Sequence, residues 1–225
     1  MRHLSTFALL FITFGLAVSL SAQAADAPPT TPEAVLRRAE ERFRSLTDYR
    51  CRATLESQSG KKREVGEYQV WVKLPGMLRV HVDRGRGRGS DIAMARDGSI
   101  RGRKGGLLKA FVMGLDADDK RLRSIRGNPV TEFDWGSFYR KLRAHAALPG
   151  ARLTLEPRPA NTAAPYVLVV TYSEGGKNYR EFTRIDPSLW VMVSGDVYEG
   201  VVLVDHVEFR DIHFNTGLTD GFFRL

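Results

Sequence analysis

The side chains that could do acid–base or metal chemistry are few and scattered in this sequence. After residue 24 the histidines are His81, His145, His206 and His213, and none belongs to an HExxH or comparable metal-ligand spacing. His206 and Glu208 share one face of a predicted strand, so a single hydrogen-bonded pair could form there. We interpret that stretch as a solvated, charged strand face. No Gly-x-Ser-x-Gly nucleophile turn occurs either, and we expect no enzyme activity, no metal and no cofactor.

Positive charge is concentrated in one segment. Residues 84–126 contain twelve Lys or Arg against five Asp, whereas the rest of the chain after residue 24 is neutral overall. The alternation of Arg and Gly over residues 84–89 is similar to an RNA-binding repeat, and it lacks the strand-to-helix context of a dinucleotide site. Two interpretations stay open: a flexible solvated hairpin loop, or a surface that attracts anionic lipid head groups or an acidic partner. In the second, the contacts are made by Arg84, Arg86, Arg88, Arg101 and Arg103.

Residues 1–24 have the composition of a secretory signal peptide. Arg2 gives a positive start, residues 7–20 are almost all apolar, and Ala22-Gln23-Ala24 provides a cleavage pattern. The apolar run is shorter than the roughly 20 residues that a membrane span needs, although an uncleaved anchor remains the alternative. We expect residues 25–225 to form one soluble, monomeric domain in a bacterial-type periplasm, where nucleic acid is not a partner.

The single cysteine, Cys51, limits the covalent chemistry. It excludes an internal disulfide, and its distance from the predicted cleavage site excludes lipid attachment there. Cys51 alternates with apolar neighbours, so we interpret it as a buried, inert thiol. The roughly 200 residues after the signal are enough for a real hydrophobic core, which must provide the stability by packing alone.

Two patterns alternate along the chain. Thr31-Pro32-Glu33 is a helix start, and apolar residues then recur at helical spacing as far as Leu46. Strict alternation of apolar and polar residues follows in residues 49–55, 67–74 and 78–83, and again in shorter strands at 91–95 and 99–103. These segments predict a first helix and then an antiparallel meander.

The middle of the chain interrupts this meander. Residues 107–115 have apolar residues at helical spacing, and Asp134 can cap a further helix that ends before Pro149-Gly150. Strands are predicted again over residues 152–156, 166–172, 178–185, 189–198 and 201–212. The pattern indicates an α+β fold with one antiparallel sheet of roughly ten strands, which is large enough to curl, and helices that cover its apolar face.

Short motifs resemble a known group of proteins. The segments concerned are Trp71-Val72-Lys73-Leu74-Pro75, Ile185-Asp186-Pro187 and Ile212-His213-Phe214-Asn215-Thr216-Gly217-Leu218-Thr219-Asp220, followed by Phe222-Phe223. They are similar to the LolA/LolB-like superfamily of periplasmic lipoprotein carriers, of which this chain resembles a divergent branch. The resemblance implies an unclosed half-barrel whose concave face is apolar and covered by helices acting as a lid. It also implies binding of acyl chains in that space. At the position matching Leu74 the carrier has an arginine that hydrogen-bonds the lid, so lid closure coupled to loading is not implied here.

The strand alternation predicts which residues face such a cavity. The sheet positions are Val70, Val72, Leu74, Leu78, Val80 and Val82, and the lid positions are Leu107, Leu108, Phe111, Val112 and Leu115. An apolar cavity of this kind would bind methylene groups through buried area, at about 25 cal/mol per Å². Two functions follow as hypotheses: a protein that binds and transfers lipid or lipoprotein acyl chains, or an envelope interaction or sensor module that binds a protein partner.

Overall fold

The computed structural model describes residues 28–106, 111–159 and 162–225, which form one sheet and two α-helices. Helix α1 (Pro32–Arg44) precedes strands β1 (Asp48–Ser59), β2 (Lys62–Lys73), β3 (Met77–Arg84), β4 (Asp91–Met94), β5 (Ile100–Arg103) and β6 (Val112–Leu115). Two short 3₁₀ helices, η2 (Lys120–Leu122) and η3 (Val130–Glu132), lead to α2 (Trp135–Ala146). The chain then continues through β7 (Arg152–Leu155), β8 (Tyr166–Glu174), β9 (Lys177–Ile185), β10 (Met192–Glu199), β11 (Val202–Phe214) and η4 (Asp220–Phe223).

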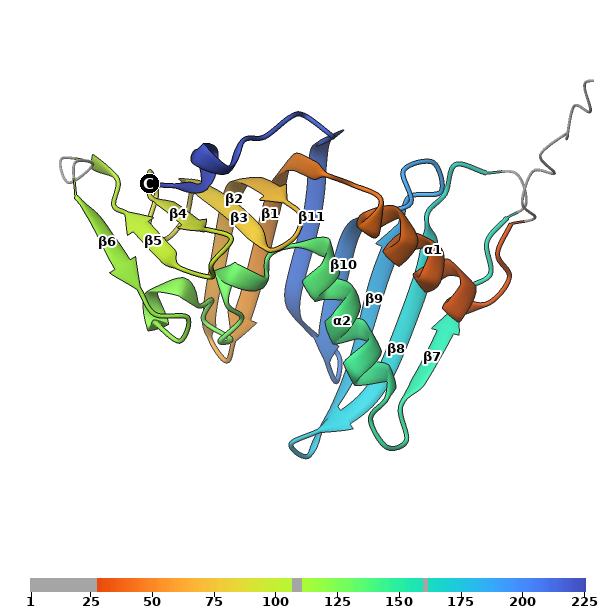
Figure 1. Ribbon diagram of the computed structural model, residues 1–225. Helices are drawn as coiled ribbons and strands as arrows, with labels where there is room; N and C mark the ends of the chain where they lie inside the picture. Colours follow the sequence, from red (N-terminus) through yellow and green to blue (C-terminus); the bar gives the residue numbers. More distant parts are fainter. Residues whose placement is uncertain (1–27, 107–110, 160–161) are drawn as a thin grey trace, which may run out of the picture.

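The sheet consists of two meanders, and the first strand of one (β1) pairs with the last strand of the other (β11). Its strand order is β6-β5-β4-β3-β2-β1-β11-β10-β9-β8-β7, and every neighbouring pair is antiparallel. Figure 1 shows that the sheet curves and stays open, with α1 and α2 lying over its concave face. The predicted α+β half-barrel is therefore confirmed.

Local sequence signals place both helices. Thr31 caps α1 by accepting a hydrogen bond from the Ala34 amide at 3.2 Å, and Asp134 caps α2 by accepting one from the Ser137 amide at 3.1 Å. Proline occupies the first position of α1, where its missing N–H costs nothing. The predicted caps are thus confirmed, and α1 ends at Arg44 rather than at Leu46.

One predicted helix is wrong. Residues 112–115 form strand β6, which pairs with β5 in the register Ile100↔Leu115 and Arg103↔Val112. A short apolar run cannot be assigned to helix or strand by its spacing alone, and Gly114 disfavours the helix. Pairing with the edge of β5 decides the outcome. Leu107 and Leu108 lie outside the described residues.

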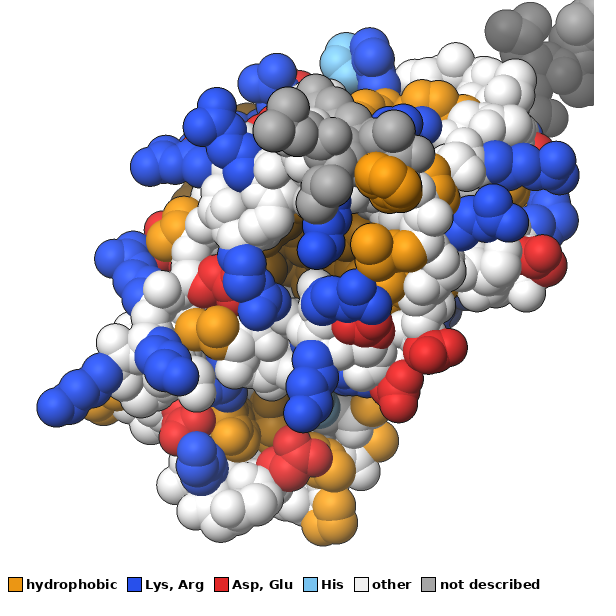
Figure 2. Space-filling view, turned by 90° about the vertical axis from the view of Figure 1, so that its left-hand side faces the viewer, with side chains coloured by type: hydrophobic (Ala, Val, Ile, Leu, Met, Phe, Trp, Pro, Cys, Tyr) orange, Lys and Arg blue, Asp and Glu red, His pale blue; other side chains and the backbone are white. Residues whose placement is uncertain are grey.

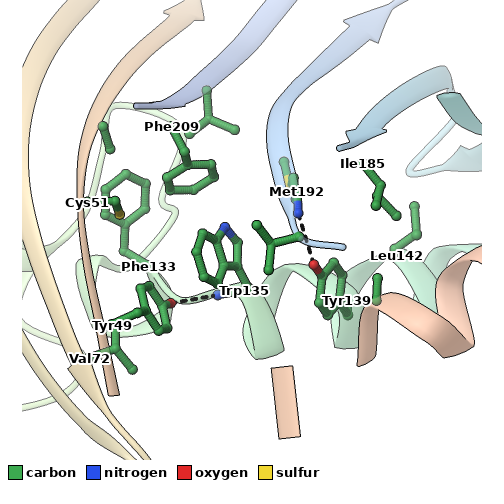
Figure 3. Packing of buried hydrophobic residues seen from close by; sticks show 14 of the residues in the cluster. Tyr49, Cys51, Val72, Phe133, Trp135, Tyr139, Leu142, Ile185, Met192 and Phe209 are labelled. Atoms are coloured by element: carbon green, nitrogen blue, oxygen red, sulfur yellow. Dashed lines mark hydrogen bonds between the residues drawn. The ribbon is translucent and has the colours of Figure 1, made fainter. Parts of the chain in front are cut away.

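The core fills the space between the helices and the centre of the sheet (Figure 3). The Trp135 ring stacks on Tyr49 with 4.0 Å between centroids, and its backbone amide donates to the Tyr49 hydroxyl at 3.2 Å. One turn further along α2, the Tyr139 hydroxyl accepts from the Met192 amide at 3.0 Å. Helix α2 is therefore attached to both halves of the sheet. Cys51 is buried in this core, and burial raises the pKa of its thiol to about 12, as an inert thiol requires.

A buried carboxylate joins the start of β1 to the C-terminal tail. Asp48 accepts hydrogen bonds from the Thr216 amide at 2.6 Å, the Thr216 hydroxyl at 2.7 Å and the Gly217 amide at 3.1 Å. Burial acts to raise the pKa of Asp48, but these hydrogen bonds more than offset it, and the pKa lies below its ordinary value. The ionised form thus stabilises the fold.

We expect Asp48→Asn to lower the free energy of unfolding by about 1–3 kcal/mol near neutral pH, because it removes charge-assisted hydrogen bonds. A lowered pKa means that the stabilisation is complete above the ordinary aspartate value of about 4 and is lost as the pH falls through the folded-state pKa. Urea unfolding near neutral pH and in acid should show the two proteins converging in acid. Asp211→Asn on exposed β11 is the control, and an equal loss there would contradict the assignment.

Candidate functional site

A pocket of about 350 Å³ lies between α2, the segment 121–133 and the concave face of the sheet. Its apolar wall includes Leu55, Tyr68, Val82, Ile92, Leu122, Val130, Phe133, Phe138, Leu142, Val197 and Val207. This volume is at the lower end of the roughly 300–1,000 Å³ typical of small-molecule sites. Figure 2, seen from the β6 side, shows hydrophobic side chains recessed between Lys and Arg side chains. The site can therefore hold an apolar group with polar groups near its rim.

The predicted sheet positions divide between core and pocket. Val82 lines the pocket, whereas Val70, Val72, Leu78 and Val80 are buried in the core cluster that includes Trp135 and Phe133. Leu74 is partly buried against the same cluster, next to a cis peptide bond with Pro75. The two helices thus fill the concave face over the centre of the sheet. The pocket lies on the part of the concave face that the two helices do not fill.

Of the predicted lid positions, the three that the structure describes do not cover the pocket. Phe111 and Val112 are 65% and 40% exposed at the start of the edge strand, and Leu115 is half-buried within it. The segment that does roof the pocket is 121–133, which contributes Leu122, Val130 and Phe133. Its apolar residues have no regular spacing, so periodicity alone could not identify it as a lid.

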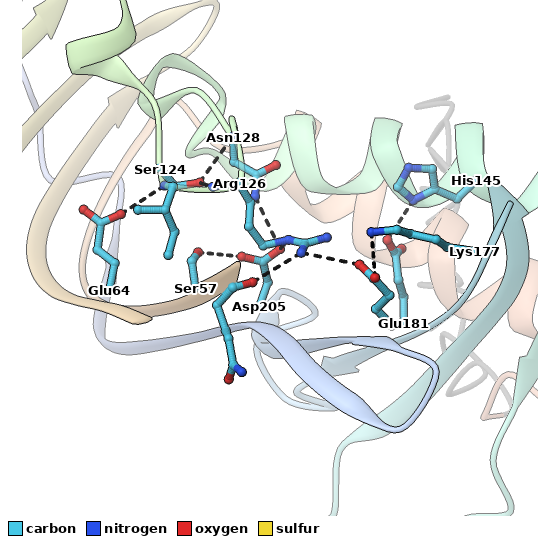
Figure 4. A network of polar contacts seen from close by, with 12 residues as sticks. Ser57, Glu64, Ser124, Arg126, Asn128, His145, Lys177, Glu181 and Asp205 are labelled. Carbon is cyan, nitrogen blue, oxygen red and sulfur yellow. Dashed lines mark hydrogen bonds and ion pairs between the residues drawn. The ribbon is translucent and has the colours of Figure 1, made fainter. Parts of the chain in front are cut away.

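The roof segment is attached to the sheet by Arg126 (Figure 4). Its guanidinium lies 3.0 Å from the Asp205 carboxylate and 3.6 Å from Glu199, and it donates to the Gln58 carbonyl at 3.3 Å. The Ser57 hydroxyl also donates to Asp205, at 2.5 Å. Burial raises the pKa of Asp205, and its hydrogen bonds and the nearby Arg126 oppose that rise only in part. The Arg126 guanidinium therefore favours the ionised form of the buried Asp205 carboxylate.

A second polar cluster lies on the pocket wall between α2 and strands β8 and β9. Nδ1 of His145 lies 2.8 Å from Glu181, and the Tyr172 hydroxyl donates to the same carboxylate oxygen at 2.9 Å. The His145 and Tyr172 rings stack with centroids 4.4 Å apart. Contact with Glu181 raises the pKa of His145, which holds the pair in its ionised form over a wider range of pH. His145, Tyr172 and Glu181 therefore add a charged and aromatic section to the pocket lining.

The predicted head-group arginines are dispersed. Arg86 lines the pocket, pairs with Glu64 at 3.1 Å and donates to the Arg123 carbonyl. Arg84 pairs with Glu67, and Arg88 is exposed. The alternation of β5 places Arg101 and Arg103 on the opposite, convex face, where Arg103 contacts Asp91 at 2.7 Å. Of the five predicted residues, only Arg86 belongs to the pocket.

The His206–Glu208 pair that the strand alternation on β11 allowed does not form. His206 contacts Asp196 of the neighbouring strand at 2.6 Å, and Glu208 accepts from Arg210. A cross-strand neighbour is closer than the next residue but one on the same strand. Within residues 28–106, 111–159 and 162–225, no three His, Cys, Asp or Glu side chains gather as a metal site would require. The same residues contain no helix long and apolar enough to cross a membrane.

Comparisons with known proteins identify the fold. No family model matches the sequence, and no curated protein matches it. The crystal structure of MucB superposes with a TM-score of 0.50 at 16% identity, over 86% of this chain and 62% of MucB. A Pseudomonas aeruginosa MucA/MucB complex also matches, so MucB is a protein with a known protein partner.

Two further structures are similar at lower scores. Mycobacterium tuberculosis lipoprotein LppX matches with a TM-score of 0.49 at 11% identity, over 84% of this chain and 97% of LppX. A LolA superfamily protein from Nitrosomonas europaea matches with a TM-score of 0.40 at 11% identity, over 88% of this chain and 99% of that protein. With its open eleven-stranded sheet and two covering helices, the described part of the chain has the same fold as MucB.

Proposed function

We propose that this chain is a periplasmic binding protein that holds the acyl chains of a lipid or lipoprotein in the pocket beneath segment 121–133. The observation that carries the proposal is an apolar pocket on the concave face, of ligand-binding size, in a chain that begins with a predicted export signal. Acyl chains gain free energy from buried area without specific hydrogen bonds. The pocket wall supplies such area from both halves of the sheet.

The polar rim supports an amphiphilic ligand. Arg86, Arg121, Arg123 and Lys141 lie at the pocket beside acidic partners such as Glu64 and Glu132. Tails would enter the apolar interior, and a polar head group would stay among these exposed charges, where it keeps its hydration.

A protein partner is the second candidate function. It is favoured by the likeness to MucB, which forms a complex with MucA. In this alternative the fold presents its roof segment and basic surface to an envelope protein. Native mass spectrometry of protein purified without detergent separates the two functions. A copurifying lipid supports the first function. The second is supported if the purified protein carries no lipid, takes up no fluorescent fatty acid, and copurifies with one envelope protein in stoichiometric amount.

Filling the pocket should weaken the binding of an acyl chain. Val197 lines the pocket on β10, and Val197→Trp places a large ring in the space proposed for the acyl chain. We expect affinity for a fluorescent fatty acid to fall on the order of tenfold or more, with little change in thermal stability. Val65→Trp on the convex face is the matched control, which should bind as the unmodified protein does. Equal affinities of the two variants would place the ligand elsewhere.

Releasing the roof should speed exchange. Arg126→Met keeps the aliphatic stem but removes the cation that ties segment 121–133 to Asp205 and Glu199. We expect fatty-acid dissociation in stopped-flow displacement to accelerate severalfold. The free energy of unfolding should fall by about 1–3 kcal/mol, because Asp205 is left buried without its partner.

Two variants separate exchange from stability. Asp205→Asn added to Arg126→Met should restore stability but leave exchange fast, since the roof is still untied. Arg37→Met is the control, because Arg37 lies away from the pocket and pairs with Glu41 within α1 at 3.9 Å. Unchanged dissociation from Arg126→Met would show that this segment is not the gate.

A further inference from the structure

The turn between β10 and β11 carries an unusual run of exposed apolar residues. Val201 is 94% exposed, Val202 45% and Leu203 37%. The two-residue loop Gly200-Val201 has φ of +61° at Gly200 only, as a type II′ turn requires, so the turn itself needs glycine and makes no demand for valine. Exposing three consecutive apolar residues to water costs free energy. A run of this kind at a hairpin tip therefore indicates a binding role.

Neighbouring turns place positive charge beside this tip. Strand β11 pairs with β1 up to Ser57↔Asp205, so the β1–β2 hairpin tip, with the exposed Lys61 and Lys62, lies at the same end of the sheet as the β10–β11 turn. The described residues provide neither lysine with an ion-pair partner, whereas Lys177 of the β8–β9 turn pairs with Glu199 at 2.7 Å. Figure 1 shows these turns at the same end of the sheet.

The pocket reaches this end as well. The pocket is lined by Glu174 and Tyr179, which lie on either side of the β8–β9 turn. It is also lined by Val197 and Asp205, which lie a few residues before and after the β10–β11 turn. The exposed tip therefore lies next to one end of the pocket. At the tip itself, the Gly200 amide donates to the Asn178 carbonyl at 2.9 Å, so this turn amide is already satisfied within the protein.

We propose that residues 201–203 dock this end of the molecule on an anionic phospholipid membrane, with Val201 entering the head-group layer and Lys61 and Lys62 contacting lipid phosphates. A role of this docking in lipid transfer rests on the function proposed above, but the docking itself does not. Charge complementarity favours a membrane over an apolar protein partner. Lysines attract anionic lipids within a Debye length of about 8 Å at physiological salt. Aliphatic side chains then gain from leaving water at the interface.

Vesicle cosedimentation tests the proposal on the full chain without its signal segment. Vesicles of phosphatidylcholine alone are compared with vesicles containing about one third phosphatidylglycerol, a composition that creates the surface potential. We expect clear binding to the anionic vesicles and at least a tenfold loss with Val201→Asp. Lys61→Glu with Lys62→Glu should weaken binding to anionic vesicles and abolish its salt dependence. Ala163→Asp, an exposed apolar residue in the loop at the other end of β8, should bind normally.

Several results would overturn the docking. The first is that the unmodified protein does not bind anionic vesicles, and the second is that Val201→Asp binds them equally well. The third is that the free protein self-associates and Val201→Asp abolishes this, because a second copy of the chain would then be the partner of the tip. Uptake of a fluorescent fatty acid is measured in parallel without vesicles, where Val201→Asp should behave as the unmodified protein. Uptake without vesicle binding contradicts docking alone, and vesicle binding without uptake contradicts only the acyl-chain function.

Discussion

The pairing of β1 with β11 is the interaction on which the rest of this structure depends. It joins two meanders that share no other strand pairing, from Tyr49↔Phe214 at one end to Ser57↔Asp205 at the other. Asp48 reinforces the seam at its start, because it holds the backbone that follows β11. Contacts across roughly 150 residues or more cost chain entropy before they return any stability. Without this seam neither the concave face nor the pocket between its halves would exist.

The pocket arises from incomplete cover. The helices have 13 and 12 residues, which corresponds to lengths of about 20 and 18 Å, and they cannot cover eleven strands. Over the centre, Trp135 and Tyr139 fill the concave face and attach α2 to both halves of the sheet. Beyond them the roof is segment 121–133, attached partly by the ion pairs of Arg126 rather than by packing alone.

The prediction from sequence succeeded where the decisive interactions are local. Thr31 and Asp134 cap their helices with their own neighbouring amides, and the alternation in β2 and β3 follows from the two-residue period of any strand. It failed at residues 112–115, where pairing with β5 overrides a weak helical spacing. It also failed to separate Val82, which lines the pocket, from Val80, which lies in the core, because both belong to the same face of one strand.

The sequence by itself determined the α+β class, the helix starts, the faces of most strands and the buried thiol, since each follows from periodicity or capping within a few residues. It also indicated a basic middle segment, although not which arginines meet the pocket. Only the tertiary structure decided that Arg86 and Arg126 lie at the pocket while Arg103 faces away. It alone also decided that the exposed Val201 lies at the same end of the sheet as Lys61 and Lys62. The reason is that these relations depend on strand register and on where two short helices end. Both are set by contacts between residues far apart in the chain.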